Sequence, residues 1–179
     1  MNICVFCSAN DLQEKYTRPA EELARLIAKH GHTLVWGGTD TGLMKTIASA
    51  AQNAGGKIIG ITMETLKKDA RKNADGMITT DSLDERKTAM INASDIIVVL
   101  VGGIGTLDET AEVMELKKLH IHKKPIIILN TDNFYEGLKI QLDKMKKEGF
   151  IANPNEELVF FVDTPQEAME HLKQVALEN

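Results

Sequence analysis

Short apolar runs alternate with longer amphipathic stretches along the whole chain. Apolar runs typical of strands cover residues 2–7, 33–36, 57–62, 77–80, 96–101, 126–129 and 158–162. The stretches between these runs have the helical spacing of apolar positions, at about 14–30, at 43–53, from Ser82 onward, after Thr106, at 134–147 and from Pro165 onward. Residues 63–72 are expected to form a charged helix or a loop. Runs that are apolar at every position are typical of parallel strands buried on both faces. We therefore expect an α/β fold with a doubly wound parallel sheet flanked by helices on both faces.

The apolar run at 96–101 leads into a glycine-rich segment and then into a helical pattern. The segment contains Gly102, Gly103, Gly105 and Thr106. A strand that breaks into glycines and restarts as a helix leaves unpaired backbone N–H groups at the positive end of that helix. Glycine also lets an anion approach the backbone, because no Cβ stands in the way. The segment is therefore either a phosphate site or an ordinary tight turn between a strand and a helix.

Another glycine-rich segment, residues 37–42, follows the run at 33–36; it is the first glycine-rich segment in chain order. Its spacing departs from the G-x-G-x-x-G pattern of dinucleotide sites, and it lacks the Lys-Ser/Thr ending of a P-loop. In a parallel sheet, both segments open on the edge formed by the C-terminal ends of the strands, where ligands of such folds bind. We expect one phosphate and its ribose to need donors from both segments, which makes Gly38 and Gly42 candidates for binding.

Charged residues on the neighbouring helices are the candidates for chemistry. Arg86 and Lys87 are either a solvated basic pair or, for Arg86, a bidentate ligand that points into the cleft. Glu109 and Glu112 share one helical face, where acids often only complement the helix dipole, as Asp108 does. Glu109, however, lies about one turn behind the glycines, within reach of the ribose of a bound nucleotide. A carboxylate there can stabilise the oxocarbenium-like charge of glycosidic cleavage or direct the attacking water.

The composition limits the partners and the compartment. The 179 residues carry a net charge of −5 with both signs interspersed, which argues against a nucleic-acid or membrane-surface protein. No signal peptide or membrane-length apolar run is visible, so we expect a cytoplasmic protein. Cys4 and Cys7 should face opposite sides of one strand as buried, reduced thiols. His120 and His122 lie in a polar turn without further ligands, so surface roles are favoured, and we expect neither a metal nor another cofactor.

Three groups of residues resemble the LONELY GUY (LOG) family of cytokinin riboside 5′-monophosphate phosphoribohydrolases, long labelled possible lysine decarboxylases. The family signature P-G-G-x-G-T-x-x-E is similar to residues 101–109. The upstream Arg-Lys pair followed by Met matches Arg86, Lys87 and Met90. The family segment Y-G-G-G-x-x-G-L-M is similar to residues 36–44. The resemblance runs from the first strand to the last helix.

This resemblance implies a Rossmann-like nucleotide-binding domain, residues 1–179, in a homodimer whose partner subunit completes the cleft. It implies hydrolysis of the N-glycosidic bond of AMP or its N6-modified forms, with free base and ribose 5-phosphate as products. It assigns catalytic roles to Arg86 and Glu109. The other predicted site residues bind the nucleoside monophosphate: Gly38, Gly42, Lys87, Gly102, Gly103, Gly105, Thr106 and Glu112. Nothing in the sequence marks a lysine for pyridoxal phosphate, so the family's older label has no support.

Several positions depart from the family pattern. Thr39 and Lys45 replace glycines of the first glycine-rich segment, and Val101 replaces the signature proline. Leu116 and Lys118 replace a tryptophan and a glutamine of the helix after the signature. These departures leave open which base is accepted. They also keep two alternatives open, namely a non-catalytic nucleotide-binding or sensing module and a carrier of a phosphorylated cofactor.

Overall fold

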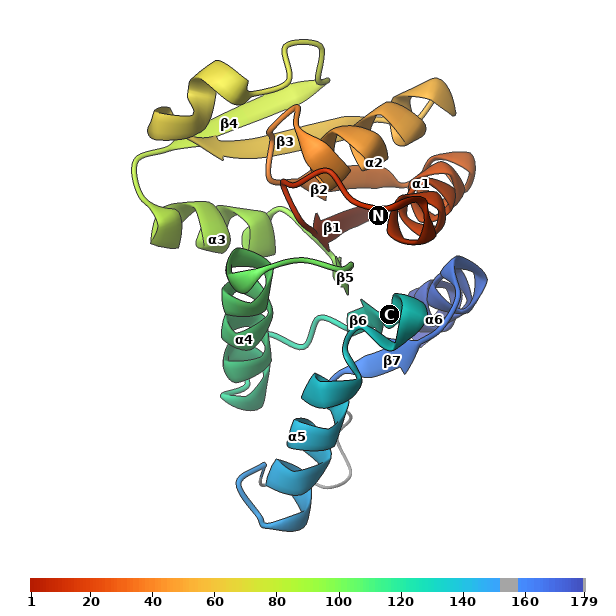
Figure 1. Ribbon diagram of the computed structural model, residues 1–179. Helices are drawn as coiled ribbons and strands as arrows, with labels where there is room; N and C mark the ends of the chain where they lie inside the picture. The colour runs from red at the N-terminus through yellow and green to blue at the C-terminus, as the bar shows by residue number, and fades with distance from the viewer. Residues whose placement is uncertain (152–157, 179) are drawn as a thin grey trace.

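The strands lie side by side in one parallel sheet with helices on both faces (Figure 1). The computed structural model describes residues 1–151 and 158–178, and within them the sheet has seven strands in the order β4-β3-β2-β1-β5-β6-β7. The strands are β1 (Asn2–Phe6), β2 (Thr33–Trp36), β3 (Ile58–Met63), β4 (Gly76–Thr80), β5 (Ile96–Val99), β6 (Ile126–Leu129) and β7 (Phe160–Val162). The predicted doubly wound α/β fold is confirmed.

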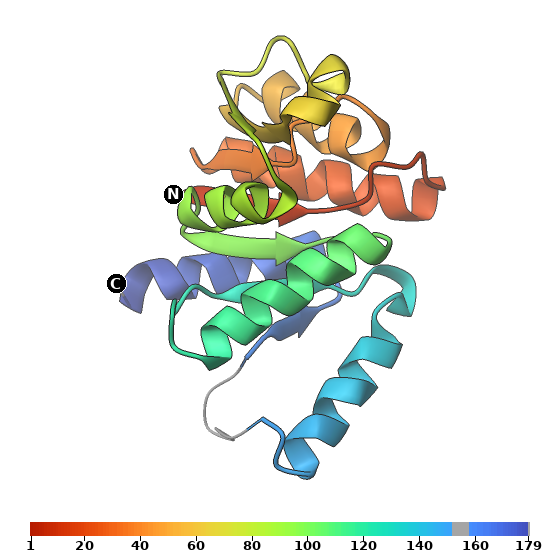
Figure 2. The ribbon, with the colours of Figure 1, turned by 90° about the vertical axis from the view of Figure 1, so that its left-hand side faces the viewer.

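Two helical layers cover the sheet (Figure 2). The helices are α1 (Glu14–Lys29), α2 (Gly42–Asn53), α3 (Leu83–Asn92), α4 (Ile104–Lys118), α5 (Glu136–Lys147) and α6 (Pro165–Glu178), with the short 3-10 helices η1 (Glu64–Asp69) and η2 (Thr131–Asn133). Apolar residues of α1, α2 and α6 share one hydrophobic core with the sheet, and those of α3 and α4 share the other. Cys4 and Cys7 are free and buried in opposite cores, as expected from their spacing.

Most predicted bounds differ from the observed ones by one or two residues, but α4 is an exception. The sequence places its start after Thr106, whereas the helix begins at Ile104. Gly103 has extended backbone angles and is the N-cap residue, so Gly105 and Thr106 belong to the first helical turn and not to a loop. Of the described residues, no helix is long and apolar enough to cross a membrane.

The strand order reverses between β1 and β5, because the chain leaves β4 at the edge of the sheet and returns beside β1. Phe6 pairs with Val99 across these two strands, so their C-terminal ends are aligned. Beyond them, the Ser8 N–H donates to the Val101 carbonyl oxygen at 3.1 Å. The segments after β1 and β5 therefore meet at the switch in strand order, where ligands of doubly wound sheets bind.

Candidate active site

The N-terminus of α4 presents backbone amides at this switch point. The Leu107 N–H donates to the carbonyl oxygen of the N-cap residue Gly103 at 3.0 Å, which is the first hydrogen bond of the helix. The N–H groups of residues 104–106 precede it, so the helix itself gives them no acceptor. They lie at the positive end of the helix dipole, an arrangement that binds anions.

Gly102 and Tyr135 hold this backbone in place from two sides. A Cβ at Gly102 would lie 2.1 Å from the Thr106 hydroxyl oxygen, so the segment folds onto its own helix only with glycine there. The buried Tyr135 hydroxyl donates to the carbonyl oxygen of Leu100, two residues before Gly102, at 2.8 Å. The amides are therefore positioned before any ligand arrives.

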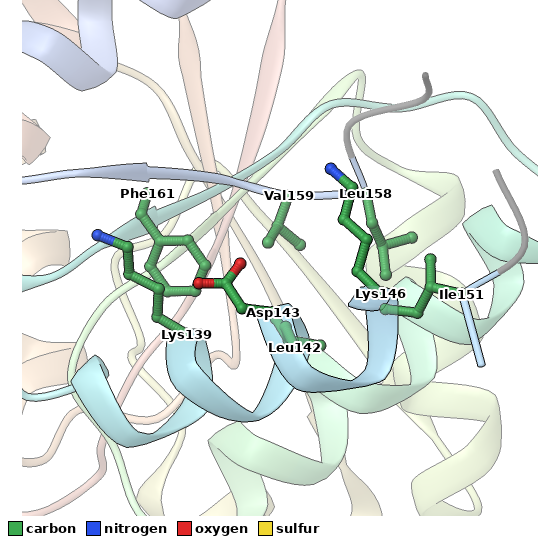
Figure 3. A pocket seen from close by; sticks show the side chains of 8 residues that line it. All are labelled: Lys139, Leu142, Asp143, Lys146, Ile151, Leu158, Val159 and Phe161. Carbon is green, nitrogen blue, oxygen red and sulfur yellow. The ribbon is translucent and has the colours of Figure 1, made fainter. Parts of the chain in front are cut away.

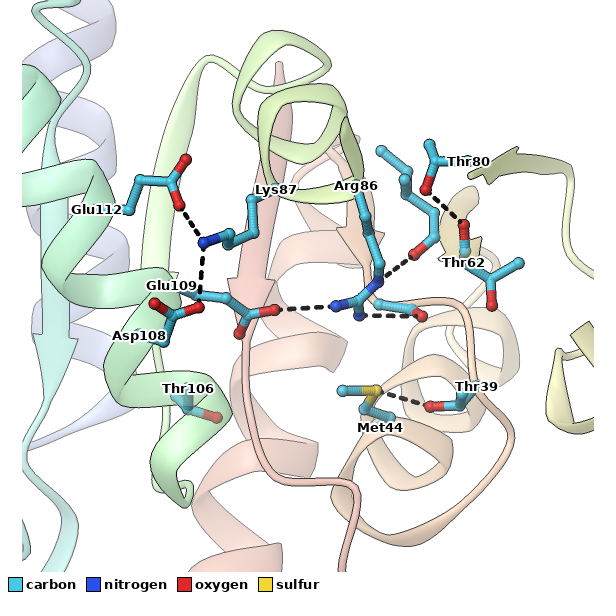
Figure 4. A network of polar contacts seen from close by, with 12 residues as sticks. Thr39, Met44, Thr62, Thr80, Arg86, Lys87, Thr106, Asp108, Glu109 and Glu112 are labelled. Atoms are coloured by element: carbon cyan, nitrogen blue, oxygen red, sulfur yellow. Dashed lines mark hydrogen bonds and ion pairs between the residues drawn. The ribbon is translucent and has the colours of Figure 1, made fainter. Parts of the chain in front are cut away.

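Arg86 extends from α3 into the space between the two glycine-rich segments and is only 6% exposed (Figure 4). Its Nε donates to the Ile61 carbonyl oxygen at 3.0 Å, and its Nη2 donates to the Gly37 carbonyl oxygen at 3.3 Å. A Cβ at Gly37 would lie 2.2 Å from Nη2, so this close approach depends on glycine. The guanidinium is therefore fixed by the ends of β2 and β3 and is not a solvated surface charge.

Glu109 of α4 faces this guanidinium. The Arg86 Nη1 donates to the Glu109 Oε1 at 3.2 Å, and both side chains are buried. Burial raises the pKa of Glu109 to about 7, while the positive charge of Arg86 opposes that rise. A carboxyl group with such a pKa can accept and return a proton near neutral pH, which suits general acid–base chemistry.

Lys87, the next residue of α3, has different surroundings. Its ammonium lies 3.1 Å from Asp108 and 2.5 Å from Glu112, both on α4, and 3.6 Å from Asp84 on its own helix. The hydrogen bond to Glu112 is the main cause that raises the pKa of Lys87. The pair of Lys87 and Glu112 thus links α3 to α4, and neither residue lines the cavity beside Arg86 and Glu109.

A cavity of about 500 Å³ opens beside the Arg86–Glu109 pair. Its lining residues come from the segments after β1, β2, β3 and β5 and from α2, α3 and α4: Cys7, Ser8, Ala9, Asn10, Thr39, Thr41, Met44, Leu66, Asp69, Arg86, Gly103, Ile104, Gly105, Thr106 and Glu109. This volume suits a small ligand with a phosphate at one end. Within the described part of the chain, no three His, Cys, Asp or Glu side chains are placed to hold a metal ion.

A smaller hollow of about 260 Å³ lies between α5 and β7, away from the glycine-rich segments (Figure 3). Lys139, Asp143 and Lys146 of α5 lie on one side of it, and apolar residues that include Phe161 lie on the other. It contains neither the buried ion pair nor a helix N-terminus. The cavity beside Arg86 and Glu109 is therefore the better candidate for an active site.

Comparison with known proteins decides the family. The model of the family described as possible lysine decarboxylase matches residues 44–172. The chain is 34% identical over 169 residues to the cytokinin riboside 5′-monophosphate phosphoribohydrolase of Mycobacterium tuberculosis, covering 93% of this chain and 90% of that one. It is 37% identical over 161 residues to the enzyme of that name, LOG5, from Arabidopsis thaliana, covering 88% and 70%. The chain belongs to the LOG family.

Solved structures similar to this LOG-family chain include proteins whose names describe a different function. The molybdenum cofactor binding protein of Rippkaea orientalis has a TM-score of 0.77 at 25% identity, covering 98% of this chain and 96% of that one. The molybdenum cofactor carrier protein of Chlamydomonas reinhardtii has a TM-score of 0.73 at 26% identity, covering 98% and 97%. The LOG fold is thus shared by proteins whose names describe hydrolysis and by others whose names describe cofactor binding.

The structure brings part of the predicted LOG site together. Arg86, Gly103, Gly105, Thr106 and Glu109 line the cavity. The other predicted residues do not line it: Gly38, Gly42, Lys87, Gly102 and Glu112. The glycines among these shape the backbone instead. A Cβ at Gly42, for example, would lie 2.3 Å from the Ala9 carbonyl oxygen, which lets the segment after β1 pack against α2.

Sequence reasoning missed several lining residues of this LOG-family cavity: Ser8, Asn10, Thr39, Thr41, Met44, Leu66 and Asp69. Most of them directly follow β1 and β2, so the rule that ligands bind beyond strand C-termini could have found them. Leu66 and Asp69 belong to η1, a region where the sequence pattern does not distinguish a helix from a loop. Their position depends on contacts with the first glycine-rich segment, which no local pattern contains.

Proposed function

We propose that the protein hydrolyses the N-glycosidic bond of cytokinin riboside 5′-monophosphates and of AMP, and releases the free base and ribose 5-phosphate. One observation carries the proposal: the buried Arg86–Glu109 pair borders the same cavity as the free amides of α4. The relatives named phosphoribohydrolases support the reaction class. An enzyme of this class needs a phosphate site, a fixed cation and a carboxylate beside the sugar, and this cavity offers all three kinds of group.

The phosphate of the nucleotide binds the N–H groups of residues 104–106. Two or three hydrogen bonds from backbone amides, together with the helix dipole, hold a dianion without any side-chain cation. Glu109 follows about one helical turn later, so the ribose attached to this phosphate comes to lie beside its carboxylate. Arg86 keeps that carboxylate in place and offers its remaining N–H groups to the sugar or the phosphate.

Cleavage breaks the bond between C1′ and the base nitrogen, and the electron pair leaves with the base. Positive charge then grows on the ribose, and the Glu109 carboxylate stabilises it in a water-poor site. Water adds to C1′ and gives up one proton, which Glu109 can accept, while the departing base takes up one proton. Proton uptake and release therefore balance.

Base release measured by chromatography tests this proposal. We expect the wild-type protein to release adenine from AMP and isopentenyladenine from isopentenyladenosine monophosphate. Glu109→Gln should lower kcat at least a hundredfold, the scale of a lost transition-state interaction, with its melting temperature near the wild-type value. Glu115→Gln is the matched control, because Glu115 is an exposed residue of the same helix and pairs with Lys118 at the surface. Near-native turnover of Glu109→Gln would contradict the mechanism.

A carrier of a phosphorylated cofactor is the second candidate, favoured by the fold shared with the two molybdenum cofactor proteins. The same samples separate the candidates. A non-catalytic nucleotide-binding module would be stabilised by AMP against heat but would release no adenine after long incubation. A carrier of a larger cofactor would show neither stabilisation by AMP nor base release.

We also propose that the protein forms a homodimer in which the partner subunit closes the cavity. Large apolar side chains at the N-terminal ends of α3 and α4 support this, because Leu83 is 46%, Ile104 is 81% and Leu107 is 41% exposed. Ile104 also lines the cavity, so a surface that covers it would complete the binding site.

A further inference from the structure

The cavity extends past the catalytic pair, away from the phosphate end. Thr106 lies on one side of the Arg86–Glu109 pair, and Thr39 and Met44 lie on the other (Figure 4). Leu66 and Asp69 of η1 line the cavity together with Thr39 and Met44. A nucleotide with its phosphate on α4 and its C1′ beside Glu109 therefore directs its base toward these residues.

The backbone of Asp69 is fixed at this end by the first glycine-rich segment. The Asp69 carbonyl oxygen accepts from the Asp40 N–H at 2.8 Å, and the Arg71 N–H donates to the Gly38 carbonyl oxygen at 2.9 Å. Between them, Thr39 and Ala70 form an isolated antiparallel bridge. The end of η1 is thus joined to the segment after β2 by these two backbone hydrogen bonds, which form the bridge.

The side chains of Arg71 and Asp40 already have partners. Arg71 Nη1 donates to the Asp40 carboxylate at 2.6 Å, and its Nε donates to Gln52. Asp69 lines the cavity, and its carboxylate, in contrast, has no hydrogen bond or ion pair within the described residues. A carboxylate on a fixed backbone, at the end of the cavity where the base arrives, is an acceptor available to the ligand.

We propose that Asp69 accepts a hydrogen bond from the exocyclic amino group of the base, so that the site selects amino-substituted bases over keto bases. This inference rests on the proposed function. An ionised carboxylate only accepts hydrogen bonds, so it attracts the amino group of adenine and repels the keto oxygen of hypoxanthine. An N6-alkylated adenine keeps one N–H and stays compatible. The apolar parts of Met44 and Leu66 offer contact area to the ring.

The test compares kcat/KM for base release from AMP and from inosine monophosphate. For the wild type, we expect a preference for AMP of at least about tenfold, the scale of one hydrogen bond to a charged group. Asp69→Ala should reduce the preference by lowering the value for AMP. Asp69→Asn should shift it further toward inosine monophosphate, because the amide can donate to the keto oxygen. Glu64→Gln is the matched control, since Glu64 belongs to the same 3-10 helix, pairs with Lys67 and does not line the cavity.

The outcomes separate this inference from the proposed function. An AMP preference that stays the same in both Asp69 variants would overturn the role of Asp69, while adenine release by the wild type would uphold the hydrolase. Equal rates of the wild-type protein with the two nucleotides would also overturn it. If the wild type releases base from neither nucleotide, the proposed function fails and this inference fails with it.

Discussion

At the residue scale, two adjacent basic side chains of α3 have different environments. Arg86 is held by backbone carbonyl groups of β3 and the first glycine-rich segment and by Glu109, whereas Lys87 lies among three carboxylates. The sequence predicts that both residues lie near the glycine-rich segments. It cannot predict that one lines the cavity and the other joins two helices, because that depends on how α3 packs between β3 and α4.

The pKa of Glu109 gives a prediction for the pH dependence of turnover. Burial raises this pKa to about 7, and the carboxylate is the form that stabilises the sugar cation. Below that pH, kcat should therefore fall about tenfold per unit, and above it kcat should level off. Base release at saturating AMP from pH 5 to pH 9 measures this profile. The dissociation constant of AMP over the same pH range serves as the control for changes in binding, because the phosphate group of AMP itself titrates near pH 6. A profile that is flat from pH 5 to pH 9 would contradict a role for the ionised Glu109.

Lys87→Met should destabilise the fold. The substitution leaves Asp84, Asp108 and Glu112 close together without a cation. Because these carboxylates reach solvent, we expect a loss of about 1–3 kcal/mol in the free energy of unfolding and not the larger cost of a fully buried pair. Urea denaturation measures it. Lys118→Met is the control, since Lys118 pairs with Glu115 at the surface and should change stability by less than about 0.5 kcal/mol. Equal losses in the two variants would mean that the ion pairs between α3 and α4 stabilise the fold no more than a surface pair does.

At the element scale, the site depends on where α4 begins. The sequence correctly places the glycine-rich segment beyond β5, but it assigns Gly105 and Thr106 to a loop because glycine is a poor helix former. In the structure, Gly103 ends the extended segment and the helix starts one residue later. For η1 the sequence fails for another reason: its position is set by backbone contacts with residues 38–40, which are distant in the chain.

Gly105→Ala should separate stability from binding. Nothing lies within 4 Å of a Cβ at Gly105, and alanine is the better helix former, so the ligand-free protein should gain up to about 1 kcal/mol. The added methyl group stands where the phosphate approaches the backbone, so the affinity for AMP should fall at least tenfold. Gly137→Ala in α5 is the matched control, because nothing lies within 4 Å of a Cβ at Gly137 and this residue does not line the cavity. Thermal unfolding with and without AMP measures both effects. Equal AMP affinity in the two variants would mean that the phosphate does not bind at the N-terminus of α4.

At the scale of the whole molecule, the reversal of strand order brings the site together. Alternating strands and helices predict the doubly wound class, and the alternation alone does not give the order β4-β3-β2-β1-β5-β6-β7. That order places the segments after β1, β2 and β5 beside one another, although they lie far apart in the chain. Residues such as Ser8 and Thr39 become neighbours of Glu109 only through this topology.

Leu107→Glu should separate the subunits of the proposed homodimer. Leu107 is an exposed apolar residue in the first turn of α4, and it does not itself line the cavity. A charge there disfavours burial against a second copy, so sedimentation should show a monomer, and base release should fall at least tenfold. Ile140→Glu on the exposed face of α5 is the control and should stay dimeric and active. A dimeric, active Leu107→Glu variant would place the subunit contact elsewhere.

The central claim is that the amides of α4 hold the phosphate while residue 109 faces the sugar. A crystal structure of the Glu109→Gln variant with AMP measures this directly. The account predicts phosphate oxygens within hydrogen-bonding distance of the N–H groups of residues 104–106, with C1′ facing the side chain at position 109. A phosphate bound away from α4, or a side chain at position 109 turned away from the ribose, would contradict it.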